Sequence, residues 1–268
     1  MRIIQGIQII RLIHDRGLLC MEVIALISQK GGVSKTTSAV NIGAGLSQRG
    51  KRVLLVDLDA QGSLTSIVGG SAEGLTILDC LQRKCKAEQA IQRAAQVDLI
   101  AASEGLAAEG ILTATGKEYR LREALQGLRG AYDYILLDCP PSLGILSINA
   151  LTAADSAIIL AQADTLSLQA IRQLSGTIDV VRRYTNQSLG IRGILIARYS
   201  GRAVLSREAA EMIEAQAEAM GTKVFATRIR ECIAIKEAQA MRLDIFSYAG
   251  KSNGAKDYTA VIAEILEG

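Results

Sequence analysis

The sequence predicts an α/β protein, with a single doubly wound, mainly parallel sheet flanked by helices. Short runs of β-branched and aliphatic residues alternate with longer segments of helical periodicity along the chain, which is the pattern of successive βαβ units. No Pro-, Gly- or Ser-rich linker interrupts this alternation, and 268 residues suffice for one large domain. With two Phe and no Trp, the core has to be built from Leu, Ile, Val and Ala.

The expected elements follow one another in regular order. Short apolar runs predict strands at 23–27, 52–56, 97–101, 132–137, 157–161 and 191–197, with a short one at 224–226. Apolar residues at helical spacing predict helices at 38–46, 118–128, 166–183, 205–220 and from about 255 to 266. Because helical patterns separate the strand runs, the connections are expected to be crossovers that keep neighbouring strands parallel.

The most informative stretch lies between the first strand and the first helix. Strand, glycine-containing turn and helix in this order form a phosphate-binding loop, where backbone N–H groups and the helix N-terminus converge on an anion. In such a loop Lys35 contacts the β- and γ-phosphates, and the Thr36 hydroxyl is a ligand of Mg²⁺. The predicted nucleotide-binding residues are Lys30, Gly31, Gly32, Val33, Ser34, Lys35, Thr36 and Thr37.

Two features set this loop apart from the strict G-x-x-x-x-G-K-[ST] pattern. The two glycine positions of that pattern fall on Gln29 and Ser34. The loop also begins with a second lysine, Lys30, although one lysine suffices to hold a nucleotide within one subunit. Asn41, one turn into the first helix, is either a contact of the site or a plain residue of the helix surface.

Carboxylates follow two further predicted strands. Asp57 and Asp59 come after the strand at 52–56, and Asp138 comes after the strand at 132–137. The carboxyl ends of neighbouring parallel strands point into one crevice, where such sheets bind ligands. We therefore expect the loop and the three acids to form one nucleotide and metal site.

These three motifs carry a family resemblance. The segments Lys30-Gly31-Gly32-x-x-Lys35-Thr36-Thr37, Asp57-x-Asp59-x-Gln61-Gly62 and Asp138-x-Pro140-Pro141 resemble those of the deviant Walker-type ATPases of the ParA/Soj/MinD group. Within that group the chain looks most like a ParA/Soj partition ATPase. The resemblance extends from about Met21 to the C-terminus.

The resemblance implies roles for the site residues. Lys30 would reach across a homodimer to the partner's ATP, so that two subunits sandwich two nucleotides. Catalysis would rest on Lys30, Lys35 and Asp59, and Mg²⁺ would be held by Thr36, Asp57 and Asp138. The sequence does not decide which of Asp57 and Asp59 positions the attacking water.

The chain departs from the family pattern at three places. Ser34 stands where a glycine precedes the loop lysine, which restricts the backbone there. Ala60 replaces a common proline in the second motif. An Ile-Pro-x-Asn segment near the adenine is replaced by Ile229-Arg230-Glu231-Cys232, so that the family's base contacts cannot be carried over.

The first twenty residues do not belong to the domain pattern. Family members begin just before their first strand, so we expect residues 1–20 to be an N-terminal extension that is not native and residues 21–268 to be the ATPase domain. A segment that contacts a membrane or a partner is the alternative. The five cysteines include no C-x-x-C pair and only one histidine is present, which favours free thiols in a reducing cytoplasm over a zinc site.

The net charge of the chain does not indicate whether it binds DNA. The formal charge is +3, so DNA binding has to be argued from local placement. The segment around Arg202 resembles a loop whose arginine contacts the DNA backbone in Soj-like proteins. Contacts to phosphates are independent of sequence and sensitive to salt. The predicted DNA-binding residues are Arg202, Arg228, Arg230, Lys251 and Lys256.

The sequence therefore predicts a slow Mg²⁺-dependent ATPase that acts as a dimerisation switch in plasmid or chromosome partition. The resemblance implies non-specific binding of double-stranded DNA in the ATP state, stimulation by a ParB-like centromere-binding protein, and a nucleoid-associated location in a bacterial cytoplasm. The alternatives are a MinD-like switch on a membrane and a positioning ATPase for a protein cargo. No membrane partner is expected, because the C-terminal segment is acidic where a membrane-binding tail would be basic.

Overall fold

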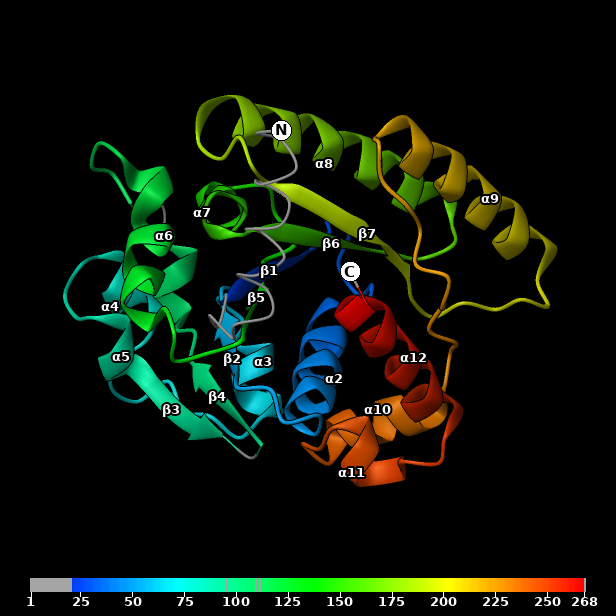
Figure 1. Ribbon diagram of the computed structural model, residues 1–268, viewed down its shortest axis with the longest axis horizontal. Helices are drawn as coiled ribbons and strands as arrows, with labels where there is room; N and C mark the ends of the chain where they lie inside the picture. The colour runs from blue at the N-terminus through cyan, green and yellow to red at the C-terminus, as the bar shows by residue number, and fades with distance from the viewer. Residues whose placement is uncertain (1–20, 95, 109, 111, 268) are drawn as a thin grey trace, which may run out of the picture.

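A seven-stranded sheet forms the centre of the protein (Figure 1). The computed structural model describes residues 21–94, 96–108, 110 and 112–267. The strands are β1 (Glu22–Ile27), β2 (Val53–Asp57), β3 (Ile91–Ala94), β4 (Val97–Ile100), β5 (Tyr134–Asp138), β6 (Ser156–Ala161) and β7 (Gly190–Ile196). Their order across the sheet is β3-β4-β2-β5-β1-β6-β7, and every neighbouring pair except β3 and β4 is parallel. The predicted doubly wound, mainly parallel sheet is confirmed.

Helices cover both faces of this sheet. One core joins the sheet to α2 (Lys35–Ser47), α3 (Ser63–Ile67), α10 (Ile233–Ala240), α11 (Ile245–Ala249) and α12 (Asn253–Glu267). The other core contains residues of α4 (Ile77–Leu81), α5 (Ala87–Ala90), α6 (Arg120–Leu125), α7 (Ile145–Ala153), α8 (Thr165–Tyr184) and α9 (Val204–Ala219). Both cores are built almost entirely from aliphatic side chains, as the composition predicts.

The structure corrects three expectations about elements. The edge strand β3 pairs antiparallel with β4, and no sequence pattern had indicated it. The strand expected at 224–226 is wrong, because only a single bridge joins Val224 to Ile194 before the chain turns away. The helix expected at 118–128 is broken into a 3₁₀ turn at Lys117–Tyr119, α6, and a second 3₁₀ turn at Gln126–Leu128.

One buried asparagine joins the first helix to the C-terminal helices. The side chain of Asn41 is 3% exposed, donates to the Thr37 carbonyl at 2.8 Å, and accepts from the Ile245 amide at 2.7 Å. Asn41 is therefore not a residue of the helix surface, and the interpretation as a plain surface asparagine is wrong.

Replacing Asn41 with alanine is expected to lower the free energy of unfolding by about 2–3 kcal/mol, because the buried Ile245 amide then has no acceptor. Urea denaturation measures this change. The control is Gln48→Ala at the exposed end of the same helix, which is expected to change stability by less than about 0.5 kcal/mol. Equal effects of the two substitutions would contradict a role for this link.

Candidate nucleotide-binding site

The topology brings the three predicted motifs to one edge of the sheet. Strand β5 lies between β1 and β2, so that Asp138 is in register with both Leu26 and Asp57. The phosphate-binding loop follows β1 directly and leads into α2. The carboxyl ends of three adjacent parallel strands thus place the loop lysine and two carboxylates together, as the sequence predicts.

The loop backbone adopts two left-handed conformations. Gly32 has φ of +74°, and a Cβ atom built on it would meet nothing within 4 Å, while its carbonyl accepts from Gln162 Nε2 at 3.1 Å. Ser34 has φ of 68°, a conformation that costs a residue with a side chain about 1–2 kcal/mol. The Ser34 carbonyl accepts the first helical bond from the Ser38 amide. This geometry explains why glycine is favoured at position 34.

Lys35 and Asp138 form the buried centre of the site. The Lys35 Nζ lies 3.7 Å from Asp138 Oδ1, and the two side chains are 8% and 0% exposed. Neither carboxylate oxygen of Asp138 accepts a hydrogen bond of normal geometry among the described residues, although the Thr36 hydroxyl lies near enough to favour its charged form. Burial raises the pKa of Asp138 to about 7, against the opposing charge of Lys35, and the nearby Asp57 raises it further. A buried carboxylate with two free oxygens fits the hard-cation chemistry of Mg²⁺.

The raised pKa of Asp138 makes the nucleotide-free protein sensitive to pH. Between about pH 4 and pH 7 the folded chain keeps a proton that the unfolded chain has lost, so stability falls as the pH rises through this window. The expected loss attributable to Asp138 is at most about 4 kcal/mol. Urea denaturation at several pH values measures it, and Asp138→Asn is expected to remove this part of the slope. An unchanged slope in the variant would contradict the assignment.

Asp57 is occupied by the chain itself. Its Oδ2 accepts from the Thr65 amide at 2.9 Å and the Thr65 hydroxyl at 2.8 Å, and its Oδ1 accepts from the Asp59 amide at 3.1 Å. Burial raises the pKa of Asp57, while the hydrogen bonds from Thr65 oppose that change. Asp57 thus fixes the turn that carries Asp59, and Thr65 is a supporting residue that the sequence motifs did not indicate.

Asp59 is more accessible than Asp57. Among the described residues, its carboxylate accepts one hydrogen bond, from the Gln61 amide to Oδ1 at 3.1 Å. Asp59 also lines an open hollow of about 470 Å³ together with Pro140 and Pro141, the residues of the third motif. Of the two aspartates in the second motif, Asp59 is the one with carboxylate oxygens available to solvent.

Lys30 is held by its own chain, away from the Lys35–Asp138 pair. Its Nζ donates to Gln162 Oε1 at 3.1 Å and forms an ion pair with Asp164, at the N-cap of α8. Burial alone would raise the pKa of Asp164, but hydrogen bonds from Lys30 and Ser167 hold it below its usual range. The motifs did not indicate Gln162 and Asp164, because more than 130 positions separate them from Lys30.

The predicted DNA-binding residues fall into two groups. Arg202, Lys251 and Lys256 are exposed and have no ion-pair partner among the described residues. Arg228 pairs with Glu214 at 2.5 Å and lies 4.7 Å from the centre of the Tyr199 ring. Arg230 makes a two-pronged ion pair with Asp257. The guanidinium groups of Arg228 and Arg230 are thus already paired with carboxylates of the same chain.

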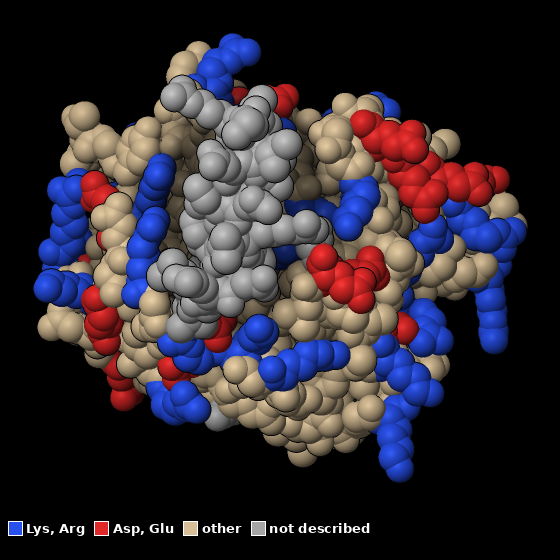
Figure 2. Space-filling view, viewed as in Figure 1, with Lys and Arg blue, Asp and Glu red and all other residues tan. Residues whose placement is uncertain are grey.

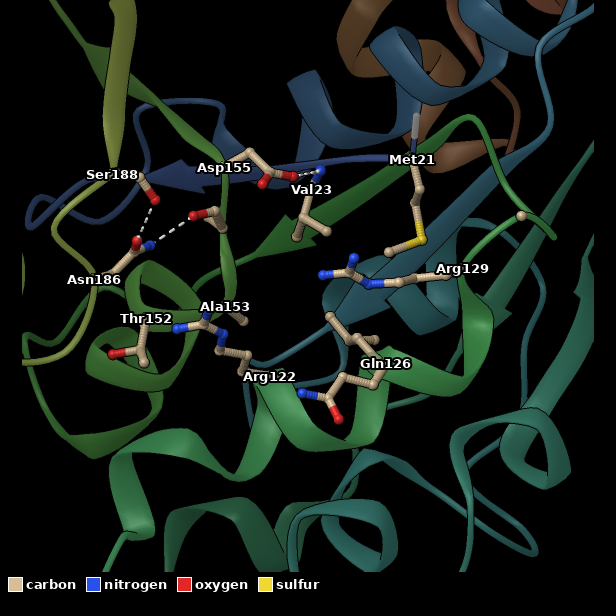
Figure 3. Close-up of a pocket in the computed structure, with 13 residues that line it drawn as sticks. Met21, Val23, Arg122, Gln126, Arg129, Thr152, Ala153, Asp155, Asn186 and Ser188 are labelled. Carbon is tan, nitrogen blue, oxygen red and sulfur yellow. Dashed lines mark hydrogen bonds between the residues drawn. The ribbon is translucent and has the colours of Figure 1, made fainter. Parts of the chain in front are cut away.

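A second hollow, of about 230 Å³, lies at the amino ends of β1 and β6, whereas the nucleotide site lies at the carboxyl ends of the strands (Figure 3). Arg122 and Arg129 reach into it. Asp155 accepts from the Val23 amide at 2.8 Å, and Asn186 donates to the Ala154 carbonyl at 2.7 Å, so these polar groups serve the fold (Figure 3). This hollow is separate from the residues of the nucleotide site.

Comparison with known proteins gives a family match over the part of the chain that carries the three motifs. The AAA domain family matches residues 21–191, which contain all three motifs. The sporulation initiation inhibitor protein Soj of Bacillus subtilis is 37% identical over 257 residues, covering 91% of this chain and 98% of Soj. The chromosome partitioning protein ParA of Caulobacter vibrioides is 35% identical over 254 residues, covering 92% and 94%. The chain belongs to the ParA/Soj-type family of P-loop ATPases.

Solved structures share the fold of this ParA/Soj-type ATPase. Apo McdA from Cyanothece has a TM-score of 0.84 at 25% identity, covering 92% of this chain and all of that chain, 100%. A cobyrinic acid a,c-diamide synthase from Mycobacterium smegmatis, with bound ADP and magnesium, has a TM-score of 0.81 at 34% identity and covers 92% and 95%. The cell division ATPase MinD of Pyrococcus furiosus has a TM-score of 0.75 at 27% identity and covers 92% and 98%. Among the described residues of the ParA/Soj-type ATPase, no helix is long and apolar enough to cross a membrane.

Proposed function

We propose that this chain is a slow Mg²⁺-dependent ATPase that acts as a dimerisation switch in plasmid or chromosome partition. The family supports nucleotide hydrolysis, and its partition members at 35–37% identity support the biological setting. The observation that carries the proposal is the place of Lys30. This loop lysine lies outside the buried Lys35–Asp138 pair and is 25% exposed, at the rim of the site.

The Lys30 ammonium can exchange its bonds within the chain for bonds to phosphate. An ammonium has three donors, and among the described residues the bonds to Gln162 and Asp164 engage two of them in the single chain. In the closed dimer, the phosphates of the partner's ATP compete with Asp164 for this cation. The contact exists only when the dimer is closed, so nucleotide state and assembly are coupled.

The carboxylates have different roles in metal binding and in hydrolysis. We infer that Thr36 and Asp138 hold Mg²⁺, and that Asp57 supports this sphere while fixing the turn at Asp59. The metal would neutralise charge on the phosphates. Asp59, with carboxylate oxygens open to solvent, orients the attacking water.

Three exposed cations support binding to DNA phosphates. Arg202, Lys251 and Lys256 have no intramolecular ion pair among the described residues, and a dimer presents each of them twice. ATP-driven dimerisation thereby converts weak single contacts into avid, non-specific binding of double-stranded DNA. A ParB-like partner then stimulates hydrolysis and releases the complex from the nucleoid.

Binding to a random-sequence duplex tests this function. With ATP we expect salt-sensitive binding that is absent with ADP or without nucleotide. Arg202→Ala in both subunits is expected to reduce the slope of log affinity against log salt by about two, one for each lost phosphate contact.

The matched control is Lys51→Ala, which removes an exposed lysine just before β2 and is expected to leave the slope unchanged. Absence of binding in every nucleotide state would contradict the DNA assignment. The alternatives, a MinD-like switch on a membrane and a positioning ATPase for a protein cargo, would then be tested with lipid vesicles and by co-purification.

A further inference from the structure

Two cysteine thiols lie in contact near the surface, where α4, α5 and α6 pack together. Cys80 lies in the last turn of α4, Cys85 follows five residues later, and their sulfur atoms are 3.5 Å apart. Cys80 is 3% exposed, whereas Cys85 is half-buried. Among the described residues, no group of three or more His, Cys, Asp or Glu side chains is arranged to hold a metal ion. The pair is therefore a dithiol without further ligands.

The backbone holds the two thiols together. At the end of α4 the Arg83 amide donates to the Cys80 carbonyl at 3.0 Å, and the Lys84 amide donates to the Asp79 carbonyl at 2.8 Å. These two bonds form a Schellman turn, and Arg83 takes its left-handed position with φ of 59°. The Arg83 guanidinium pairs with Glu123 of α6 at 2.5 Å, which ties the turn to the neighbouring helix. The chain is thus folded back so that Cys85 returns to Cys80.

The pair opens into a basic hollow. Cys80 and Cys85 line a surface hollow of about 600 Å³ whose charged residues are Arg83, Lys84, Lys86 and Arg120 against Glu88 and Glu123. Arg83 pairs with Glu123 and Lys84 lies 4.0 Å from Asp79, so Lys86 and Arg120 are the basic lining residues without an ion pair among the described residues. Basic and acidic side chains lie beside one another at the left edge of the molecule in Figure 2, where Figure 1 places α4 and α5. A small molecule that carries negative charge is therefore favoured over a neutral or cationic one of the same reactivity.

We propose that Cys80 and Cys85 form a thiol–disulfide exchange site for low-molecular-weight, anionic disulfides such as glutathione disulfide. The Cys85 thiolate attacks one sulfur of the disulfide, forming a mixed disulfide and releasing one thiol. Cys80 then gives up its proton and attacks the Cys85 sulfur, forming the Cys80–Cys85 bond and releasing the second thiol. The reagent's disulfide is reduced to two thiols while two protein thiols are oxidised, so that atoms and electrons balance.

Geometry assigns the order of the two steps. Cys85 is the more accessible sulfur and receives the reagent. Burial, together with the hydrogen bond to Cys85, raises the pKa of the Cys80 thiol and makes it the poorer first nucleophile. Once Cys85 carries the adduct, the sulfurs have to approach from 3.5 Å to about 2.05 Å, and the five-residue separation confines that movement to the turn at 82–86.

Peptide mapping of the full-length protein tests the proposal. The protein is incubated with glutathione disulfide, alkylated without reduction, and digested with trypsin. Cleavage at Arg83 and Lys84 separates the two cysteines, so the expected product is peptide 53–83 joined to the dipeptide Cys85-Lys86 and separated by reduction. Because the second step is intramolecular, we expect this product to exceed the glutathione adduct on Cys85 by at least about tenfold.

Three comparisons complete the test. Cys80→Ser is expected to stop at the adduct on Cys85, and Cys232, another half-buried cysteine, is expected to react more slowly in the same map. The neutral reagent 2-hydroxyethyl disulfide is expected to discriminate less between Cys85 and Cys232 than glutathione disulfide does. A wild-type protein that stops at the adduct or leaves both thiols reduced would overturn the exchange site. Equal discrimination by both reagents would overturn the preference for an anionic ligand.

Discussion

Replacing Lys30 with alanine is expected to abolish the ATP-dependent dimer while leaving nucleotide binding to the single subunit intact. Lys30 is bound to Gln162 and Asp164 and takes no part in the buried Lys35–Asp138 pair, so that pair does not depend on it. Each closed dimer would lose two charge-assisted contacts to phosphate, each worth about 1.5–3 kcal/mol. Dimer affinity should therefore fall by roughly a hundredfold to ten-thousandfold.

Analytical ultracentrifugation with a non-hydrolysable ATP analogue measures this loss, and fluorescent-nucleotide titration checks that binding persists. Lys35→Ala provides the contrast, because it removes the cation beside Asp138 and should abolish nucleotide binding itself. Lys51→Ala should change neither property. If Lys30→Ala still dimerises and hydrolyses ATP at the wild-type rate, the proposed sandwich is wrong.

Replacing Asp59 with alanine is expected to reduce the rate of ATP hydrolysis by about a hundredfold or more, with ATP binding and ATP-dependent dimerisation retained. The oxygens of Asp57 are taken up by Thr65 and the Asp59 amide, which leaves Asp59 as the carboxylate that can orient water. Among the described residues the Asp59 carboxylate accepts one backbone bond, and the Gly62 amide bonds to the Asp59 carbonyl, which alanine keeps, so the substitution should leave the surrounding turn in place.

Phosphate release and dimerisation are to be measured on the same preparations. Asp57→Asn is the informative comparison, since it should loosen the turn held through Thr65 and lower stability as well as turnover. Wild-type hydrolysis by Asp59→Ala would exclude Asp59 from the water chemistry. Loss of hydrolysis without loss of stability in Asp57→Asn would move that role to Asp57.

The order of the main elements was predictable because each strand carries its own signal. β1, β2 and β5 are continuous aliphatic runs that end in the loop or in a carboxylate, and this local pattern survives folding. The edge strand β3, with the sequence Ile91-Gln92-Arg93-Ala94, has no such run and forms a strand only because β4 offers it a partner.

The nucleotide site likewise has features that the sequence predicts and contacts that it does not. The motifs were sufficient to predict that the loop of Lys35 and the carboxylate of Asp138 share one crevice, since the carboxyl ends of neighbouring parallel strands meet there. The partners of Lys30 and Asp57 were not predictable, nor was the return of Cys85 to Cys80. A hydrogen bond or a sulfur contact depends on tenths of an ångström, which no spacing in the sequence specifies.

By itself the sequence determined the fold class, the phosphate-binding loop and the family, because these depend on periodicity and on residue types at fixed local spacing. Only the tertiary structure decided which charged groups are already paired, as Arg228 and Arg230 are, and which remain exposed, as Arg202, Lys251 and Lys256 do. The physical reason is that ion pairs and burial are properties of residues far apart in the chain. Glu214 and Asp257 become partners of these arginines only when β7, α9 and α12 have packed.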